Sequence, residues 1–168
     1  MGTIRHILLL AAVIGLPMNL FSQVTATGHI SVTIVSPISI TKVQDMDFGN
    51  VSVESGVGAV TLSASTKSRQ ASGNAILMDG GNVSFASFRV RGNSGSSFSI
   101  TLPSSPITVS NGEKNMTVSD FTSTPSTSAI LTDGTKEILV GATLQLKGDQ
   151  SLGLYASASD FPVTVNYN

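Results

Sequence analysis

Few residues in this sequence have the types and spacing that chemistry needs. His29 is a candidate general base or metal ligand, but it lies on the polar side of an alternating run, as a solvent-facing strand residue does. His6 is the only other histidine and there is no cysteine, which excludes Cys–His catalysis and zinc-finger sites. No Gly-rich phosphate-binding loop is present. We therefore expect no enzyme activity, no bound metal and no cofactor.

Two groups of acidic side chains have spacings that suit oxygen-ligand chemistry. Asp45 and Asp47 would share one strand face about 6–7 Å apart, which suits calcium or an acid–base pair. Asp79 and Asn82 enclose two glycines and could also offer oxygens to calcium. The plainer interpretation is a charged outer face for the first group and a hairpin turn for the second. We favour the plainer interpretation for both.

Arg89 and Arg91 are the one cationic pair that could form a ligand surface. They would share one strand face, and the polar segments 66–74 and 122–128, predicted as loops, could complete a surface that grips a glycan or an anionic cell-wall polymer. Alternatively, the pair keeps an outer or edge face soluble. The chain has no Trp and two Tyr, so aromatic platforms for sugars are few. A formal net charge of −1, with 11% charged residues, argues against nucleic acid as a partner.

The first 22 residues have the three-part layout of a secretory signal peptide. Arg5 precedes the apolar run 7–16, Pro17 breaks that run, and small Ser22 precedes Gln23. The run is about ten residues, short of the roughly 20 that a membrane-spanning helix needs. We predict cleavage after Ser22, with cleavage after Ala26 as the alternative. The expected domains are a signal peptide, 1–22, and a single β domain, 23–168, with no membrane span after cleavage.

Period-2 alternation organises the rest of the chain, and it predicts strands with one buried face each. The longest run follows the signal at once, with apolar residues at Val24, Ala26, Gly28, Ile30, Val32 and Ile34. Near the end, Ile138–Leu146 alternates, and so does a last run containing Val163, Val165 and Tyr167. Turn signals recur every eight to twelve residues, including 54–58 and Asp133-Gly134. The spacing predicts an antiparallel sandwich or barrel of roughly nine to eleven short strands.

Several short segments, taken in order, match one family. They are Pro37-Ile38-Ser39-Ile40, Asp47-Phe48-Gly49, Phe88-Arg89-Val90-Arg91-Gly92, Val140-Gly141-Ala142-Thr143-Leu144 and Val163-Thr164-Val165-Asn166-Tyr167-Asn168. Together they resemble the exported bacterial family called domain of unknown function 4402. The resemblance implies an all-β, immunoglobulin-like antiparallel β-sandwich secreted by a Gram-negative bacterium, with no assigned chemistry. The implied location is extracellular or at the outer cell surface, after periplasmic transit.

A looser similarity is to fimbrial subunits assembled by a chaperone and an usher. Those subunits end in an alternating strand with a penultimate Tyr, as Tyr167 is here, with a Gly upstream where Gly153 lies. The similarity implies partners that are copies of the chain itself or other surface subunits. Val24–Ile34 would then be a spare strand given to a neighbour; the alternative is that it is this domain's own first strand. We expect a structural or adhesive protein, with a stand-alone glycan- or cell-wall-binding module as the second hypothesis.

Overall fold

The computed structural model describes residues 23–168, so the predicted signal peptide, residues 1–22, lies outside the described part. Residues 23–168 contain eleven strands and no helix, and every strand pairing is antiparallel. None of these residues therefore forms a helix that could cross a membrane. The expected all-β class, with nine to eleven antiparallel strands, is confirmed.

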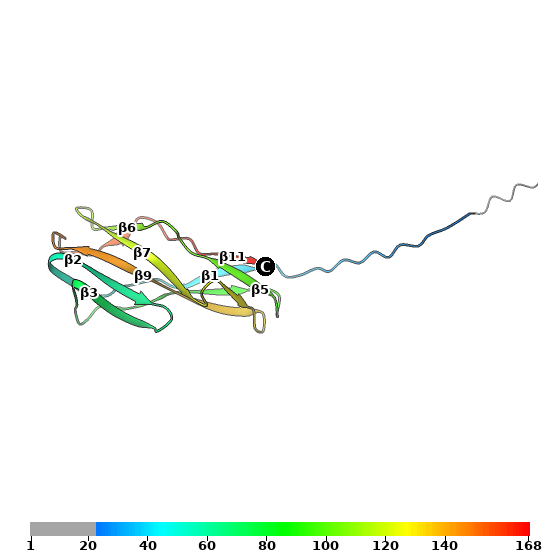
Figure 1. The fold of residues 1–168 in the computed structure, drawn as a ribbon, viewed down its shortest axis with the longest axis horizontal. Coiled ribbons are helices and arrows are strands. Elements are labelled where there is room, and N and C mark those ends of the chain that lie inside the picture. Colours follow the sequence, from blue (N-terminus) through cyan, green and yellow to red (C-terminus); the bar gives the residue numbers. More distant parts are fainter. Residues whose placement is uncertain (1–22) are drawn as a thin grey trace, which may run out of the picture. The chain divides into compact units, whose positions relative to one another are not determined.

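The strands form two sheets (Figure 1). The large sheet has the order β1-β4-β9-β7-β6-β10, and β2 joins it by pairing with both β9 and β3. Its strands are β1 Ser39–Gln44, β2 Val51–Ser63, β3 Ser68–Leu77, β4 Ala86–Arg91, β6 Ile107–Ser110, β7 Asn115–Thr124, β9 Thr135–Lys147 and β10 Ala156–Ser157. The small sheet has the order β11-β5-β8, formed by β5 Ser97–Thr101, β8 Ser128–Ile130 and β11 Thr164–Tyr167.

The main core lies between the two sheets. Phe98 and Ile100 of β5 and Val165 of β11 pack in one cluster with Val90 of β4 and Ile138 of β9. Leu131, just after β8, is fully buried in the same cluster. Because one apolar face of each sheet is buried against the other, the fold is a β-sandwich.

A second cluster lies at the β2 end of the large sheet. It contains Val60 of β2, Met116 and Val118 of β7, and Leu144 and Leu146 of β9. On β9, the alternating apolar positions from Ile138 to Leu146 are all buried, as the period-2 pattern predicts. β9 is thus the central strand, and it contributes to both clusters.

The turn predicted at residues 54–58 is an irregularity inside one long strand. β2 runs from Val51 to Ser63, and its pairing with β3 shifts register between Val53 and Gly58. Gly56 has a φ of +74°, a conformation that suits glycine and breaks the regular ladder without ending the strand. The glycine is visible in the sequence, but the sequence does not indicate that the pairing between β2 and β3 resumes beyond it, at Gly58.

The prediction of a loop at residues 66–74 is wrong for most of these residues, which belong to strand β3. The turn is confined to residues 64–67, and β3 begins at Ser68. β3 pairs with β2 alone, so it is an edge strand and most of its side chains are exposed. An edge strand can be polar because it needs little apolar surface, so its sequence resembles a loop. The loop predicted at 122–128 shrinks similarly to residues 125–127, between β7 and β8.

The two C-terminal alternating runs belong to different sheets. β9 lies in the large sheet, whereas β11 pairs with β5 in the small sheet, from Thr164 opposite Thr101 to Tyr167 opposite Phe98. The strand covers only residues 164–167, so Phe161 and Val163 precede it in irregular backbone. The last residues are therefore tied into a sheet, but not beside the run that precedes them in sequence.

Residues 23–38 contain no strand, and the first strand begins at Ser39. The compact β unit comprises Val35–Asn168, and residues 23–34 belong to the N-terminal unit. Within 23–34 the large apolar side chains Val24, Ile30, Val32 and Ile34 are all more than 85% exposed. In the described structure this run forms no strand of its own.

Candidate assembly site

Two sheet edges lie next to each other where the chain enters and leaves the β unit. β1 pairs only with β4 and β11 pairs only with β5, so each is the edge strand of its sheet. Within the described chain, no backbone hydrogen bond joins β1 to β11. Figure 1 shows both strands at the same end of the sandwich. Each strand therefore has backbone N–H and C=O groups along one side that pair with no other strand.

Side-chain contacts show that β1 and the C-terminal segment run antiparallel. Tyr167, at the end of β11, bonds to Ser36 just before β1, with Oη 2.9 Å from the backbone oxygen. Asp160, before β11, bonds to Lys42 near the end of β1, with 3.2 Å between Oδ2 and Nζ. These two contacts mark the ends of an opening between β1 and residues 160–167.

A pocket of about 230 Å³ lies at the Lys42 end of this opening, between β1 and residues 160–163, which lead into β11; we call it the β1–β11 pocket. It is lined by Ile40, Lys42, Asp45, Phe88, Asp160, Phe161 and Val163. Four of the seven lining residues are apolar, and they belong to the main core cluster or pack against it. The pocket is therefore a place where the core of the sandwich reaches the surface.

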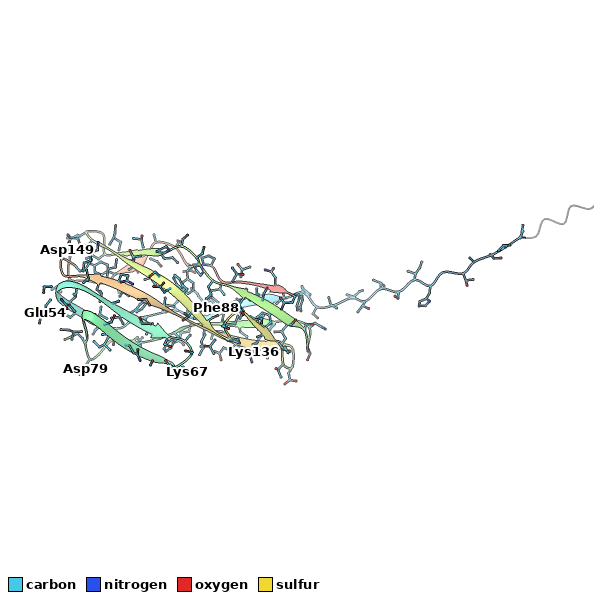
Figure 2. All side chains as sticks on the ribbon, viewed as in Figure 1. Glu54, Lys67, Asp79, Phe88, Lys136 and Asp149 are labelled. Carbon is cyan, nitrogen blue, oxygen red and sulfur yellow. The ribbon has the colours of Figure 1, made fainter. Side chains whose placement is uncertain are left out.

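Three aromatic rings form the wall of this region. Phe161 packs edge-on against Phe88, with ring centroids 6.0 Å apart, and tilted against Phe121, at 5.4 Å. Phe88 is 8% exposed, and Figure 2 labels it in the middle of the folded domain. Edge-to-face and offset aromatic pairs at these distances are favourable. Phe88 and Phe161, the two of these rings that line the pocket, give it a preformed apolar wall.

Charged groups close one end of the pocket. Lys42 Nζ lies 2.8 Å from Asp45 Oδ1 and 3.2 Å from Asp160 Oδ2. The hydrogen bond to Asp45, and then that to Asp160, raises the pKa of Lys42 above its usual value. The side chains are 42%, 79% and 84% exposed, so water screens the pairs and each contributes little to stability.

Tyr167 lies at the other end of the opening between β1 and residues 160–167, away from the residues that line the pocket. Its hydroxyl donates to the backbone carbonyl of Ser36 and accepts a hydrogen bond from the backbone N–H of Asn93, at 2.6 Å. Gly92 lies against the phenol so closely that a Cβ there would overlap the hydroxyl. The penultimate Tyr thus joins three chain segments: the entry to β1, the turn after β4 and the end of β11.

The predicted assembly residues fall into two groups. Of the C-terminal group, Val163 lines the pocket, Val165 is buried in the core, and Tyr167 bonds to Ser36 at the far end of the opening. The N-terminal group, Val24, Ala26, Gly28, Ile30, Val32 and Ile34, is exposed and outside any strand. The structure therefore offers one exposed apolar segment and one exposed apolar pocket.

Arg89 and Arg91 are exposed on the outer face of β4, as predicted. Arg89 lies opposite Thr41 of β1 and Glu137 of β9, on the strand next to the β1 edge of the large sheet. The loops meant to complete a ligand surface around this pair are shorter than expected. The prediction of a ligand surface there rests on the two arginines themselves.

The acidic candidates have structural partners. Asp45 pairs with Lys42, and Asp47 accepts a hydrogen bond from the backbone N–H of Gly49 at 2.8 Å. Asp79 lies in the predicted turn, where the two following glycines have φ near +79°. No group of three or more Asp, Glu or His among residues 23–168 is arranged to hold a metal ion. His29 lies in the exposed N-terminal segment.

Sequence analysis missed the polar and apolar partners that meet in the pocket. Lys42 and Asp160 are 118 residues apart in sequence, so no local pattern indicates their contact. Ile40 and Phe161 also meet in the pocket, and no local pattern in the sequence indicates their contact. The available signal was the break in alternation at Asp160, which ends the apolar wall with a charge.

Comparisons with known proteins agree with the order of segments noted in the sequence. Residues 38–167 match the family described as Domain of unknown function (DUF4402), a range that covers all eleven strands. No curated protein matches the chain. The matched range begins just before β1, so it contains the β1–β11 pocket and leaves out the exposed N-terminal run. The chain belongs to this family of domains of unknown function.

Proposed function

We propose that this chain is a non-enzymatic structural or adhesive subunit, exported to the surface of a Gram-negative bacterium, that joins other copies by strand exchange. The observation that carries the proposal is the N-terminal run from Val24 to Ile34. Its apolar residues alternate like a half-buried strand, yet they are exposed and pair with no strand. A run of this kind is costly to leave in water, so a partner that covers it is expected.

Strand addition supplies the physics of such an association. An added strand contributes main-chain hydrogen bonds, and its alternate side chains set the register. At about 25 cal/mol per Å² of buried apolar area, six apolar positions would contribute several kcal/mol before ordering costs. Because the donating run and the accepting edge lie on different parts of the chain, contacts between copies are head-to-tail and can form open fibres.

The proposal is tested with the mature, secreted full chain. A native mass spectrum gives the cleavage site and the oligomeric state together. We expect cleavage after Ser22 and multimers that survive heating in detergent. Deletion of residues 23–35 should leave folded monomer. A wild-type chain that stays monomeric at high concentration, and that unfolds when residues 23–35 are removed, would contradict the proposal.

A pair of matched variants separates the apolar face of the run from its polar face. The double variant Ile30→Asp and Val32→Asp puts charge on the apolar positions and should abolish multimers. The control, Ser31→Asp and Thr33→Asp, adds the same charge on the alternate positions and should keep them. Circular dichroism should show the same folded β unit in both. Equal loss of multimers in the two variants would indicate a charge effect instead of strand exchange.

The second candidate function is a stand-alone module that binds glycan or cell-wall polymer. Its supporting observation is that Arg89 and Arg91 are exposed on one face of β4. The test is a glycan and cell-wall polymer array probed with wild type and with Arg89→Ala and Arg91→Ala. Binding that the arginine variants lose would favour this function. Confirmed turnover of an ester, peptide or glycoside would contradict both candidates.

A further inference from the structure

We propose that the β1–β11 pocket is the acceptor site for residues 24–34 of a second copy, an inference that rests on the proposed strand exchange and names its site. The sandwich has other open edges, including β3 and β10. What distinguishes the opening beside β1 is that two edges from different sheets face each other there. A strand that bonds to the free edge of β1 at the pocket covers exposed core at the same time.

The chemistry of the pocket matches the apolar face of the N-terminal run. Ile40, Phe161 and Val163 are half-buried and line the pocket, and Phe88 forms part of its floor. The run carries four branched aliphatic residues with Ala26 and Gly28 on one face, and Ser, Thr and His29 on the other. Aliphatic side chains seated on the aromatic wall complete the core, while the polar face stays in solvent, as in any strand of this sandwich.

The dimensions also agree. At about 3.3 Å per residue, the opening from Ser36 to Lys42 is roughly 20 Å long, and residues 24–34 span roughly 33 Å. The run is therefore long enough to cross the opening with residues to spare. A pocket of about 230 Å³ takes a few side chains and not a whole strand, so adjacent apolar positions such as Ile30 and Val32 are the ones that enter it.

The Lys42–Asp160 ion pair acts as a gate at the charged end of the pocket, and an incoming strand can break this pair at little cost in free energy. The pair Lys42–Asp160 crosses the opening by side chains alone, and both partners are more than 40% exposed. Exposed ion pairs of this kind are weak, and Lys42 retains Asp45 when Asp160 is released. By contrast, the Tyr167 end is held through backbone groups of Ser36 and Asn93. The second copy thus enters from the Lys42 side.

Disulfide trapping tests the site, because the chain has no cysteine and introduced thiols are the only ones present. One full-length chain carries a donor thiol on the polar face of the run, His29→Cys, Ser31→Cys or Thr33→Cys. Its partner chain carries an acceptor thiol, either Thr41→Cys on β1 or Thr164→Cys on β11. The matched control is Gln70→Cys on β3, an exposed residue on another open edge.

The expected result is disulfide-linked dimer from at least one donor with both Thr41→Cys and Thr164→Cys. Yields should exceed those with Gln70→Cys by about tenfold, because a disulfide needs Cα atoms roughly 4.4–6.8 Å apart. Linkage to both edges from one donor places the strand between them. The variant Asp160→Asn, which weakens the gate, should speed the appearance of dimer.

Other outcomes overturn the inference in distinguishable ways. Multimers that link only to Gln70→Cys would leave strand exchange standing and move the acceptor to β3. A chain that carries both thiols and links only to itself, independent of dilution, would show that the pocket takes its own run. Absence of multimers from the wild-type chain would remove the proposed function together with the site.

Discussion

The hydroxyl of Tyr167 donates a hydrogen bond to the backbone carbonyl of Ser36, across 131 residues of sequence. The bond joins the penultimate residue to the point where the chain enters the β unit. The same hydroxyl accepts from the N–H of Asn93. This junction joins the entry to β1 to the end of β11 and thereby defines one end of the opening in which the β1–β11 pocket lies.

Removing the hydroxyl should loosen this junction. Tyr167→Phe leaves the Ser36 carbonyl and the Asn93 N–H without their partner, so we expect a loss of about 1–2 kcal/mol in urea unfolding. Amide exchange at Asn93 should quicken at the same time. Tyr155→Phe, which loses a single bond to the carbonyl of Ser151, is the control and should leave exchange at Asn93 unchanged. Unaltered exchange at Asn93 in Tyr167→Phe would refute the role given to the junction.

Gly141 is required because β9 passes close to the β2 backbone. A Cβ at this position would overlap the carbonyl oxygen of Leu62 and crowd the backbone N of Ala64 at 3.0 Å. Neither backbone atom can rotate away, so Gly141→Ala should lower stability by about 1–3 kcal/mol or more. Thermal unfolding measures this loss. Gly28→Ala, where no atom lies within 4 Å, is the control and should leave the unfolding temperature unchanged.

Leu131 is a core residue outside the regular strands. Its side chain is fully buried in the main core cluster, and its N–H donates to the carbonyl of Ser96 at 2.9 Å. Leu131→Ala should cost about 2–5 kcal/mol, because the cavity adds to the lost apolar burial. The neighbouring Ile130 is 57% exposed, and Ile130→Ala should cost far less. Equal midpoints in urea for the two variants would show that Leu131 is not a core residue.

The ion pairs around Lys42 should make the free energy of unfolding fall at alkaline pH. The hydrogen bonds to Asp45 and Asp160 raise the pKa of Lys42 above 10.5 in the folded chain. A raised pKa means that the charged form is favoured in the fold, so the stabilisation is fully present below pH 10.5 and is lost as pH rises through the folded value. Urea unfolding of wild type and Lys42→Gln should therefore differ slightly near neutral pH and converge above that range. A difference that persists undiminished at the highest pH would contradict this assignment.

The buried faces of the strands were predictable from local sequence. On β9 every second residue from Ile138 to Leu146 is apolar, and each is buried. The turns at Asp79–Asn82 and Asp133-Gly134 were also predictable. Gly80 and Gly81 in the first turn, and Asp133 and Gly134 in the second, adopt positive φ. A period of two and a positive φ are properties of a few adjacent residues, so a single sequence displays them.

The polar edge strand and the pairing partners were not predictable in this way. β3 was expected as a loop because its residues are polar, and it is a strand because β2 lies beside it. The long C-terminal runs were expected as half-buried strands, but nothing in them indicated that β9 and β11 would enter different sheets. Pairing depends on residues far apart in sequence, and their contact leaves no local pattern.

The sequence by itself determined that this protein is an all-β fold of short antiparallel strands with an alternating apolar run at its N-terminal side, because side-chain alternation dictates which strand face avoids water. Only the tertiary structure decided that an apolar pocket opens between β1 and residues 160–163. The physical reason is that the pocket is made by Ile40, Phe88 and Phe161, which three separate segments bring together. An edge is open or closed only relative to its neighbours, so its state is a property of the folded chain.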